Sequence, residues 1–210
     1  MNAKANDGTT PLHLACQRGN KQAVELLLAS PEIDETIIDE NGDTPLHEAC
    51  SSGETEIVDK ILTKLKTGES VNLLLPNDKQ LTPLHIACRE GYVEIVKLIL
   101  KVGFHQKKDL VEAQDNERSS PLHLACENGR EGNDTIIQTL LLYNADIFSE
   151  MEGGITPMHI AAKYGHVKVM DMLNSSGEKI FEVQDDDDQT PLHYAAVNNQ
   201  VKMIEYLIDK

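Results

Sequence analysis

TPLHLACQRG, residues Thr10 to Gly19, places a histidine and a cysteine three positions apart, behind a threonine and a proline. Residues three apart share one face of a helix, so His13 and Cys16 are either a chemical pair or parts of a packed helix. The pattern recurs, which allows the two interpretations to be compared. The copies are TPLHLAC at Thr10, TPLHEAC at Thr44, TPLHIAC at Thr82, SPLHLAC at Ser120, TPMHIAA at Thr156 and TPLHYAA at Thr190.

The copies follow one another at steps of 34, 38, 38, 36 and 34 residues. A near-constant period of this size is typical of a stacked array of similar supersecondary units. In each copy we expect Thr or Ser to cap a short helix and Pro to occupy its first position. A second, more aliphatic helix follows after a turn. The residue at that turn, suited to a left-handed conformation, is Gly19, Gly53, Gly91, Gly129, Gly165 or Asn199.

The sixfold T-P-L-H-x-A motif resembles the signature of the ankyrin-repeat family. The resemblance implies an all-α solenoid of helix-turn-helix units with β-hairpin-like finger loops, and a concave side that usually binds proteins. It covers the chain as a single domain, residues 1–210. The approximate repeats are 5–38, 39–76, 77–114, 115–150, 151–184 and a truncated 185–210. The second and third units carry extra residues that should lengthen the second helix or its loop.

Besides the residue at the turn between the two helices, each unit is expected to have a glycine in its finger, two residues before the capping Thr or Ser. It is present in three units and replaced by Gln80, Arg118 and Asp188 in the others. We expect these three fingers to form less regular turns. The glycines that remain are Gly8, Gly42 and Gly154.

The cysteines and histidines of the motif are predicted to be structural. The cysteine position alternates with alanine, which favours a small apolar side chain at a helix contact. No orienting partner for a nucleophile and no set of four zinc ligands accompanies any copy, and the sequence indicates no metal and no cofactor. We expect the motif histidines to bond the cap or the next unit's backbone, and His105 and His166 to face solvent. The cysteines are Cys16, Cys50, Cys88 and Cys126, and alanine fills the position as Ala162 and Ala196.

The formal charge of −16 argues against nucleic acid or an anionic membrane surface as partner. No apolar run is long enough to cross a bilayer, and the first residues lack a secretory signal. The run Asp185–Asp188 is interpreted as a solvated finger tip, not a Ca²⁺ loop. We therefore expect a cytoplasmic monomer that binds a protein or peptide of basic character.

Binding residues are expected where the stack leaves side chains free, at the finger tips and at the ends of the first helices. Among them, Leu81, Ile155 and Tyr164 are apolar or aromatic at positions that should be wet. The candidates at the tips are Asp7, Glu40, Asn41, Asp43, Asp78, Lys79, Leu81, Asn116, Glu117, Glu152, Ile155, Asp186 and Asp187. Those at the helix ends are Arg18, Arg89, Glu90, Lys163 and Tyr164.

Three functions fit this sequence. The first is a non-catalytic interaction scaffold that binds through the concave surface of fingers and first helices. The second is a cytosolic structural or gating segment of a larger membrane protein, because the long loops are similar to those of TRPA-type channel arrays. The third is the targeting domain of an enzyme whose catalytic part is encoded elsewhere. The first and last units both look like internal copies, so we expect the chain to be a fragment of a longer array.

Overall fold

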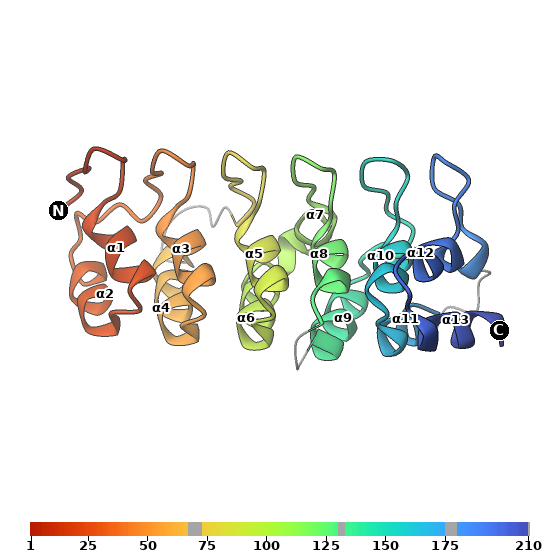
Figure 1. Cartoon of the computed structure of the whole chain (residues 1–210). Helices are drawn as coiled ribbons and strands as arrows, with labels where there is room; N and C mark the ends of the chain where they lie inside the picture. The colour runs from red at the N-terminus through yellow and green to blue at the C-terminus, as the bar shows by residue number, and fades with distance from the viewer. Residues whose placement is uncertain (67–72, 130–132, 175–179, 210) are drawn as a thin grey trace.

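The computed structural model describes residues 1–66, 73–129, 133–174 and 180–209, and every regular element in these ranges is a helix (Figure 1). The helices form six successive pairs, and loops rise from the same side of each pair. The pairs are α1 (Pro11–Gln17) with α2 (Lys21–Leu28), α3 (Pro45–Ser52) with α4 (Thr55–Lys66), α5 (Pro83–Glu90) with α6 (Val93–Val102), α8 (Pro121–Glu127) with α9 (Asn133–Leu142), α10 (Pro157–Tyr164) with α11 (Val167–Leu173), and α12 (Pro191–Val197) with α13 (Val201–Ile208).

Each first helix begins as its motif predicts. The hydroxyls of Thr10, Thr44 and Thr82 accept the backbone N–H three residues on, and proline follows each of these caps. An accepting side chain satisfies one of the N–H groups that a helix start leaves unpaired. The cap position therefore fixes where every unit starts.

The core runs along the whole array between the helix pairs. The second helices supply its largest side chains, including Ile57, Ile61, Ile95 and Ile99, none of which is exposed. The four cysteines are free and buried in the same core, as their alternation with alanine predicts. They fill space between stacked first helices.

The extra residues of two units become helix. Helix α4 has 12 residues against 8 in α2. In the third unit a 3-10 turn, η1 (Phe104–Gln106), and a short helix, α7 (Lys107–Glu112), follow α6. Helix α7 is anchored by Leu110 and Val111, which are 0% and 1% exposed. A second 3-10 turn, η3 (Ile180–Glu182), precedes the last finger.

The expectation of irregular fingers at Gln80, Arg118 and Asp188 is wrong. These residues adopt φ of 58°, 61° and 59°, in the same left-handed region as the finger glycines. Each donates its backbone N–H to the carbonyl three residues earlier, as Gly42 does. The reason is a side chain at that earlier position. Asn77, Asp115 and Asp185 each accept two backbone N–H groups of their own finger through Oδ1, and Asp39 does the same in the finger that keeps Gly42, so these bonds hold the turn with or without glycine.

Two further expectations need correction. Gly129 does not adopt the expected positive φ. The preceding Asn128 is extended, with ψ of 115°, so the chain turns away from α8 before it reaches Gly129. His166 is half-buried instead of facing solvent, and its ring stacks on Tyr164 at 6.1 Å. His105 is exposed, as predicted. Asn199, with φ of 54°, takes the left-handed position that glycine holds elsewhere.

None of the described helices is long and apolar enough to span a bilayer.

Candidate protein-binding surface

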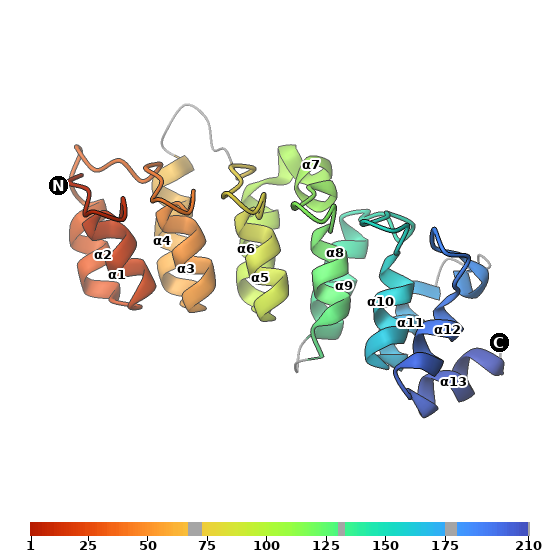
Figure 2. The ribbon, with the colours of Figure 1, turned by 45° about the horizontal axis from the view of Figure 1, so that its top comes forward.

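The fingers and the first helices make up one continuous side of the array, which we call the finger surface (Figures 1 and 2). Adjacent fingers are tied by backbone hydrogen bonds. The N–H of Glu40 donates to the carbonyl of Asp7 at 2.9 Å, and that of Asp78 to the carbonyl of Asn41 at 2.9 Å. The same bond recurs between each later pair of fingers. The tips are therefore held at a fixed spacing, so residues on neighbouring tips can act together.

Most of the predicted binding residues are accessible on this surface. Those that are exposed are Asp7, Arg18, Glu40, Asn41, Asp78, Lys79, Arg89, Asn116, Glu117, Glu152, Asp186 and Asp187, and those that are half-buried are Asp43, Glu90, Ile155, Lys163 and Tyr164. Leu81 is 5% exposed, so the expectation of a wet apolar anchor there is wrong. Its carbonyl is bonded to His47 of the preceding unit, and this places the residue inside the joint between units.

A hollow of about 360 Å³ lies on the finger surface between the second and third units. It brings together six of the predicted residues: Asn41, Asp43, Asp78, Lys79, Leu81 and Arg89. The sequence interpretation missed the residues that line it from the first helices, namely Glu48, Ser51 and Ile86, together with His47 and Asn77. Glu48 could have been found, because it is the only charged residue at the x position of the six T-P-L-H-x-A motifs.

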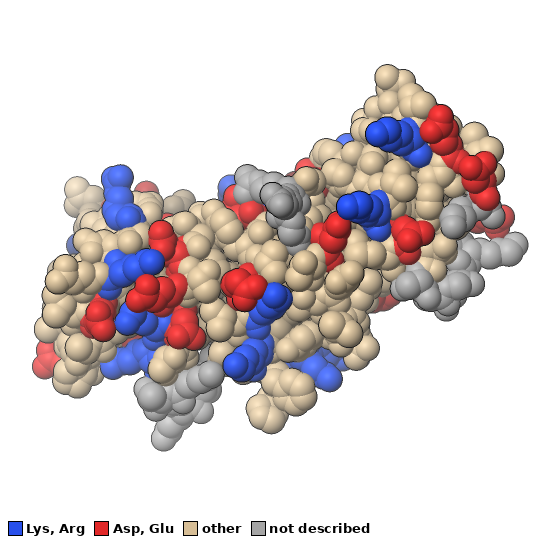
Figure 3. Space-filling view, turned by 90° about the horizontal axis from the view of Figure 1, so that it is seen from below, with Lys and Arg blue, Asp and Glu red and all other residues tan. Residues whose placement is uncertain are grey.

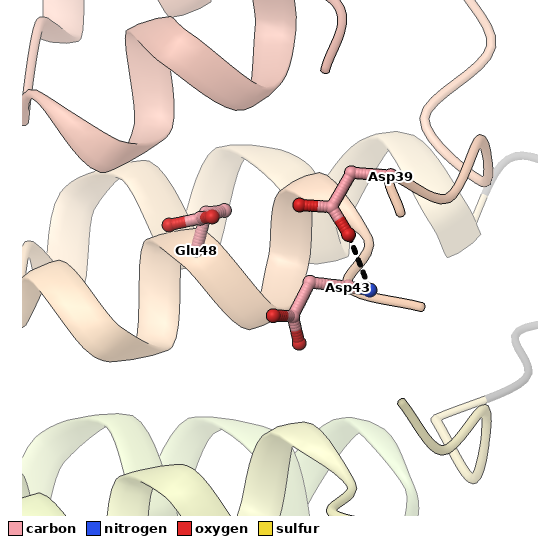
Figure 4. Close-up of side chains that lie close together, drawn as sticks. All are labelled: Asp39, Asp43 and Glu48. Atoms are coloured by element: carbon pink, nitrogen blue, oxygen red, sulfur yellow. Dashed lines mark hydrogen bonds between the residues drawn. The ribbon is translucent and has the colours of Figure 1, made fainter. Parts of the chain in front are cut away.

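Three carboxylates lie close together here (Figure 4), of which Asp43 and Glu48 line the hollow and Asp39 is buried. Asp39, Asp43 and Glu48 each have an oxygen within 4.8 Å of the others. Asp39 Oδ1 accepts the backbone N–H of Asp43 at 2.9 Å, and Asp43 Oδ1 accepts the side-chain N–H of Asn77 at 2.8 Å. The finger turn holds both aspartates in place, and Glu48 reaches them from α3.

Glu48 shows the electrostatic consequence. Its pKa is raised, first by burial and then by the negative charges of Asp43 and Asp39, while a hydrogen bond from Gln17 acts in the opposite direction. A carboxyl group shifted in this way gains from any positive charge placed beside it.

Two basic residues, Lys79 and Arg89, also line the hollow. Arg89 Nε lies 3.3 Å from Glu90 Oε1, so its charge is already shared with a carboxylate. Within the described ranges, no ion pair joins a lysine or arginine to Asp39, Asp43 or Glu48. The carboxylates are left to attract a charge from outside the chain.

Asp39, Asp43 and Glu48 are poorly suited to bind a metal ion. Asp39 Oδ1 is already occupied by two backbone N–H groups, from Asn41 and Asp43. Asp43 Oδ1 is occupied by Asn77. A hard cation such as Ca²⁺ takes six to eight oxygen ligands, and we assign no ion here.

Other predicted residues gather elsewhere. Tyr164 donates its hydroxyl proton to Glu127 at 2.6 Å, and Lys163 Nζ lies 5.3 Å from the centre of the Tyr164 ring. The bond to Glu127, followed by burial, raises the pKa of Tyr164 to about 12. This group lies between the fourth and fifth units and does not line the hollow. Asp186 and Asp187 lie on the last finger, also away from it.

Stacked helix pairs with projecting, mutually bonded fingers define a repeat scaffold, and the comparisons assign its class. The family model described as Ankyrin repeats (3 copies) matches residues 1–74, 63–150 and 129–210. The chain belongs to the ankyrin-repeat family. The fold is similar to that of the human ASB11 ankyrin repeat domain, with a TM-score of 0.76 and 26% identity, over 96% of this chain and 83% of that one.

Curated relatives match shorter stretches. The chain is 40% identical over 68 residues to palmitoyltransferase akr1 of Neurospora crassa, which covers 30% of the chain and 9% of that protein. It is 31% identical over 83 residues to the human transient receptor potential cation channel subfamily A member 1, covering 39% of the chain and 7% of the channel. The matches thus span less than a tenth of these relatives' length. Ankyrin repeats generally serve as protein-interaction scaffolds, and this is the general function of the fold found here.

Proposed function

We propose that the finger surface binds a protein or peptide, and that a lysine or arginine of this partner enters the hollow between the second and third units. One observation carries the proposal: Asp43 and Glu48 line the hollow with Asp39 beside them, and no lysine or arginine among the described residues forms an ion pair with any of the three. A partner cation that entered there would form charge-assisted hydrogen bonds with carboxylates already held in place. The other acidic tips would speed association with a basic partner.

The test is a titration with a fluorescein-labelled peptide, Gly-Ser-Arg-Leu-Arg-Ser-Gly, against the chain and two double variants. Asp43→Asn with Glu48→Gln removes charge at the hollow, and Glu117→Gln with Glu152→Gln removes the same charge from tips outside it. We expect the first pair to weaken binding about tenfold and the second to weaken it by about twofold or less. Equal effects of the two pairs would show that the peptide responds to the overall acidic charge and does not bind at the hollow. Absence of binding would contradict the proposal.

The oligomeric state and location belong to the same proposal. We propose a cytosolic monomer that needs no cofactor and contributes no catalytic residue itself. Light scattering of the purified chain tests the first part, since a mass of twice 23.3 kDa would contradict it.

A second candidate function is a structural or gating segment of a larger membrane protein. The similarity to a human TRPA-type channel supports it. So do the hydrogen bonds that link every finger to the next, because a pull on one unit would pass through them to its neighbour. Stretching a single molecule between its ends tests this function. Reversible extension without unit-by-unit rupture supports a spring, whereas stepwise rupture at low force argues against it.

A further inference from the structure

A second charged surface lies on the other side of the array and is not part of the finger surface. Between Lys97 and Lys108 the chain contains four lysines and no aspartate or glutamate, in a protein of net charge −16. We call this the rear basic surface, formed by Lys97, Lys101, Phe104, His105, Lys107 and Lys108. Figures 1 and 2 show α7, which carries part of it, behind the first helices.

Phe104 is the centre of this surface. The residue is 57% exposed. Lys107 Nζ lies 5.2 Å from the centre of the ring, and His105 contacts the ring edge-on at 5.9 Å. An exposed aromatic ring with cations beside it offers both an apolar contact and positive charge to one ligand.

The surface has a rigid support. Leu110, in α7, is completely buried. A Cβ at Gly103, just before Phe104, would clash with Leu110 Cδ1, so the turn into η1 is packed against α7. Phe104 thus lies on an insertion that is anchored to the core. A ligand that binds there loses little free energy to ordering this segment.

The charges on the rear basic surface are largely uncompensated. Lys97 pairs with Glu94 at 2.7 Å. No ion pair among the described residues involves Lys101, Lys107 or Lys108. Asp109 is the nearest acidic residue in sequence, and it is exposed. In the view from below, blue side chains run across the middle of the array toward its lower edge (Figure 3).

We infer that the rear basic surface binds an acidic protein segment that carries an aromatic or aliphatic side chain, which packs on Phe104 while its carboxylates meet Lys101, Lys107 and Lys108. This goes beyond the proposed function, because it uses the opposite side of the array and a partner of opposite charge. The overall negative charge disfavours an extended anionic membrane, which would face the whole array. A short peptide meets only the local positive charge, since fields beyond about 8 Å are screened at physiological salt. The array would then join a basic partner and an acidic one.

The test uses the fluorescein-labelled peptide Glu-Glu-Phe-Glu-Glu-Leu-Glu-Glu and a second peptide in which Ser replaces Phe and Leu. Fluorescence anisotropy should show saturable binding of the first that weakens with added salt, and binding of the second at least about tenfold weaker. Phe104→Ala and the double variant Lys107→Glu with Lys108→Glu should each weaken the first peptide about tenfold, a loss of about 1.4 kcal/mol. The matched control, Lys168→Glu with Lys202→Glu, makes the same charge change on other, exposed lysines.

Several outcomes would overturn the inference. They are no saturable binding, an unchanged affinity in Phe104→Ala, or an equal loss in both charge-reversed pairs. Sedimentation with vesicles containing about one-third phosphatidylserine covers the other source of negative charge. Vesicle binding without peptide binding would show that the partner of this surface is a membrane and not a protein. The Arg-containing peptide of the finger surface should bind all these variants normally, which separates failure of this inference from failure of the proposed function.

Discussion

Nε2 of His47 lies 3.1 Å from the carbonyl oxygen of Leu81 in the next unit, while Nδ1 of the same ring accepts the backbone N–H of Thr44 at 3.1 Å. A backbone N–H can only donate, so Nδ1 is unprotonated and Nε2 carries the proton that it donates to the carbonyl. One neutral imidazole thus caps its own helix and joins it to the neighbouring finger. The same pair of bonds is made by His13, His85, His123 and His159.

We expect His85→Ala to lower the free energy of unfolding by about 2–4 kcal/mol, because it removes a cap and leaves buried groups of two units unpaired. His193→Ala is the matched control. That ring accepts the Thr190 N–H but is exposed, and no described residue bonds its Nε2, so the expected loss is about 1 kcal/mol or less. Urea unfolding of both variants provides the measurement. Equal losses would show that the link between units contributes nothing.

Stability should fall as the pH drops from about 6.5 toward 4. Burial lowers the pKa of His85 and of His123 to about 4, and it lowers those of His47 and His159 as well. The unfolded chain therefore binds protons in this window that the folded chain excludes, and acidification favours unfolding. Urea midpoints measured across the window test this. A chain with His85→Asn should depend less on pH, and an unchanged pH dependence would contradict the assignment.

Glu48→Gln should raise stability at neutral pH and weaken binding of the Arg-containing peptide. The raised pKa of Glu48 means that its ionised form is disfavoured in the folded state, and the neutral amide avoids this cost. The side chain is partly exposed, so the gain should be less than about 1 kcal/mol. Thermal unfolding and the peptide titration, made on the same samples, measure both effects. A loss of stability would mean that Glu48 holds the finger instead of a partner.

Replacing a left-handed finger residue by glycine should stabilise the array. Arg118→Gly relieves a side chain held at φ of 61°, with an expected gain of about 0.5–1 kcal/mol. Gly42→Ala is the opposite experiment, since a Cβ there would lie 2.8 Å from the Asp78 backbone nitrogen. Chemical denaturation of the two variants should show shifts of opposite sign. Destabilisation by Arg118→Gly would show that the arginine makes a compensating contact.

The buried thiols should resist modification until the chain unfolds. Burial raises the pKa of Cys16 to about 12 and raises the pKa of Cys88 as well, so the reactive thiolate is scarce. Ellman's reagent should react slowly with the native chain and at once with the chain in urea. Cys88→Ala should cost at most about 1 kcal/mol, because alanine fills this position in two units, whereas Cys88→Ser should cost about 1–3 kcal/mol. Rapid labelling of the native chain would contradict the packing.

The fold could be predicted because its determinants are local and repeated. A cap, a proline and a histidine recur at a nearly fixed period, and each acts within one turn of helix. Finger regularity could not be read from glycine alone, since Asn77, Asp115 and Asp185 replace its effect by bonding the turn through their side chains. An Asp or Asn five residues before the cap is the signal that would have indicated this.

The candidate site was predicted only in part. Finger tips can be located by counting back from the cap, so Asp43 and Asp78 were found. Leu81 depends on how two units meet, which no single unit encodes, whereas Glu48 depends on how α3 lies against the finger of its own unit. Leu81 precedes its cap and enters the joint with His47, whereas Glu48 reaches the finger from α3. The three carboxylates belong to one unit, residues 39–76, and only the hollow, which Asp43 and Glu48 line together with Asp78 and Lys79, needs the assembled pair.

Because Nε2 of each of these five histidines donates to a main-chain oxygen of the next unit, the bond does not depend on which side chain the accepting residue carries. Leu81, Ser119, Ile155 and Gln189 all serve, although their side chains share no chemistry. Removing residues 77–114 in one piece would bring Ser119 to His47 in place of Leu81, and the joint could close again. A whole unit can thus be removed or added while the histidine bond at the new joint stays the same.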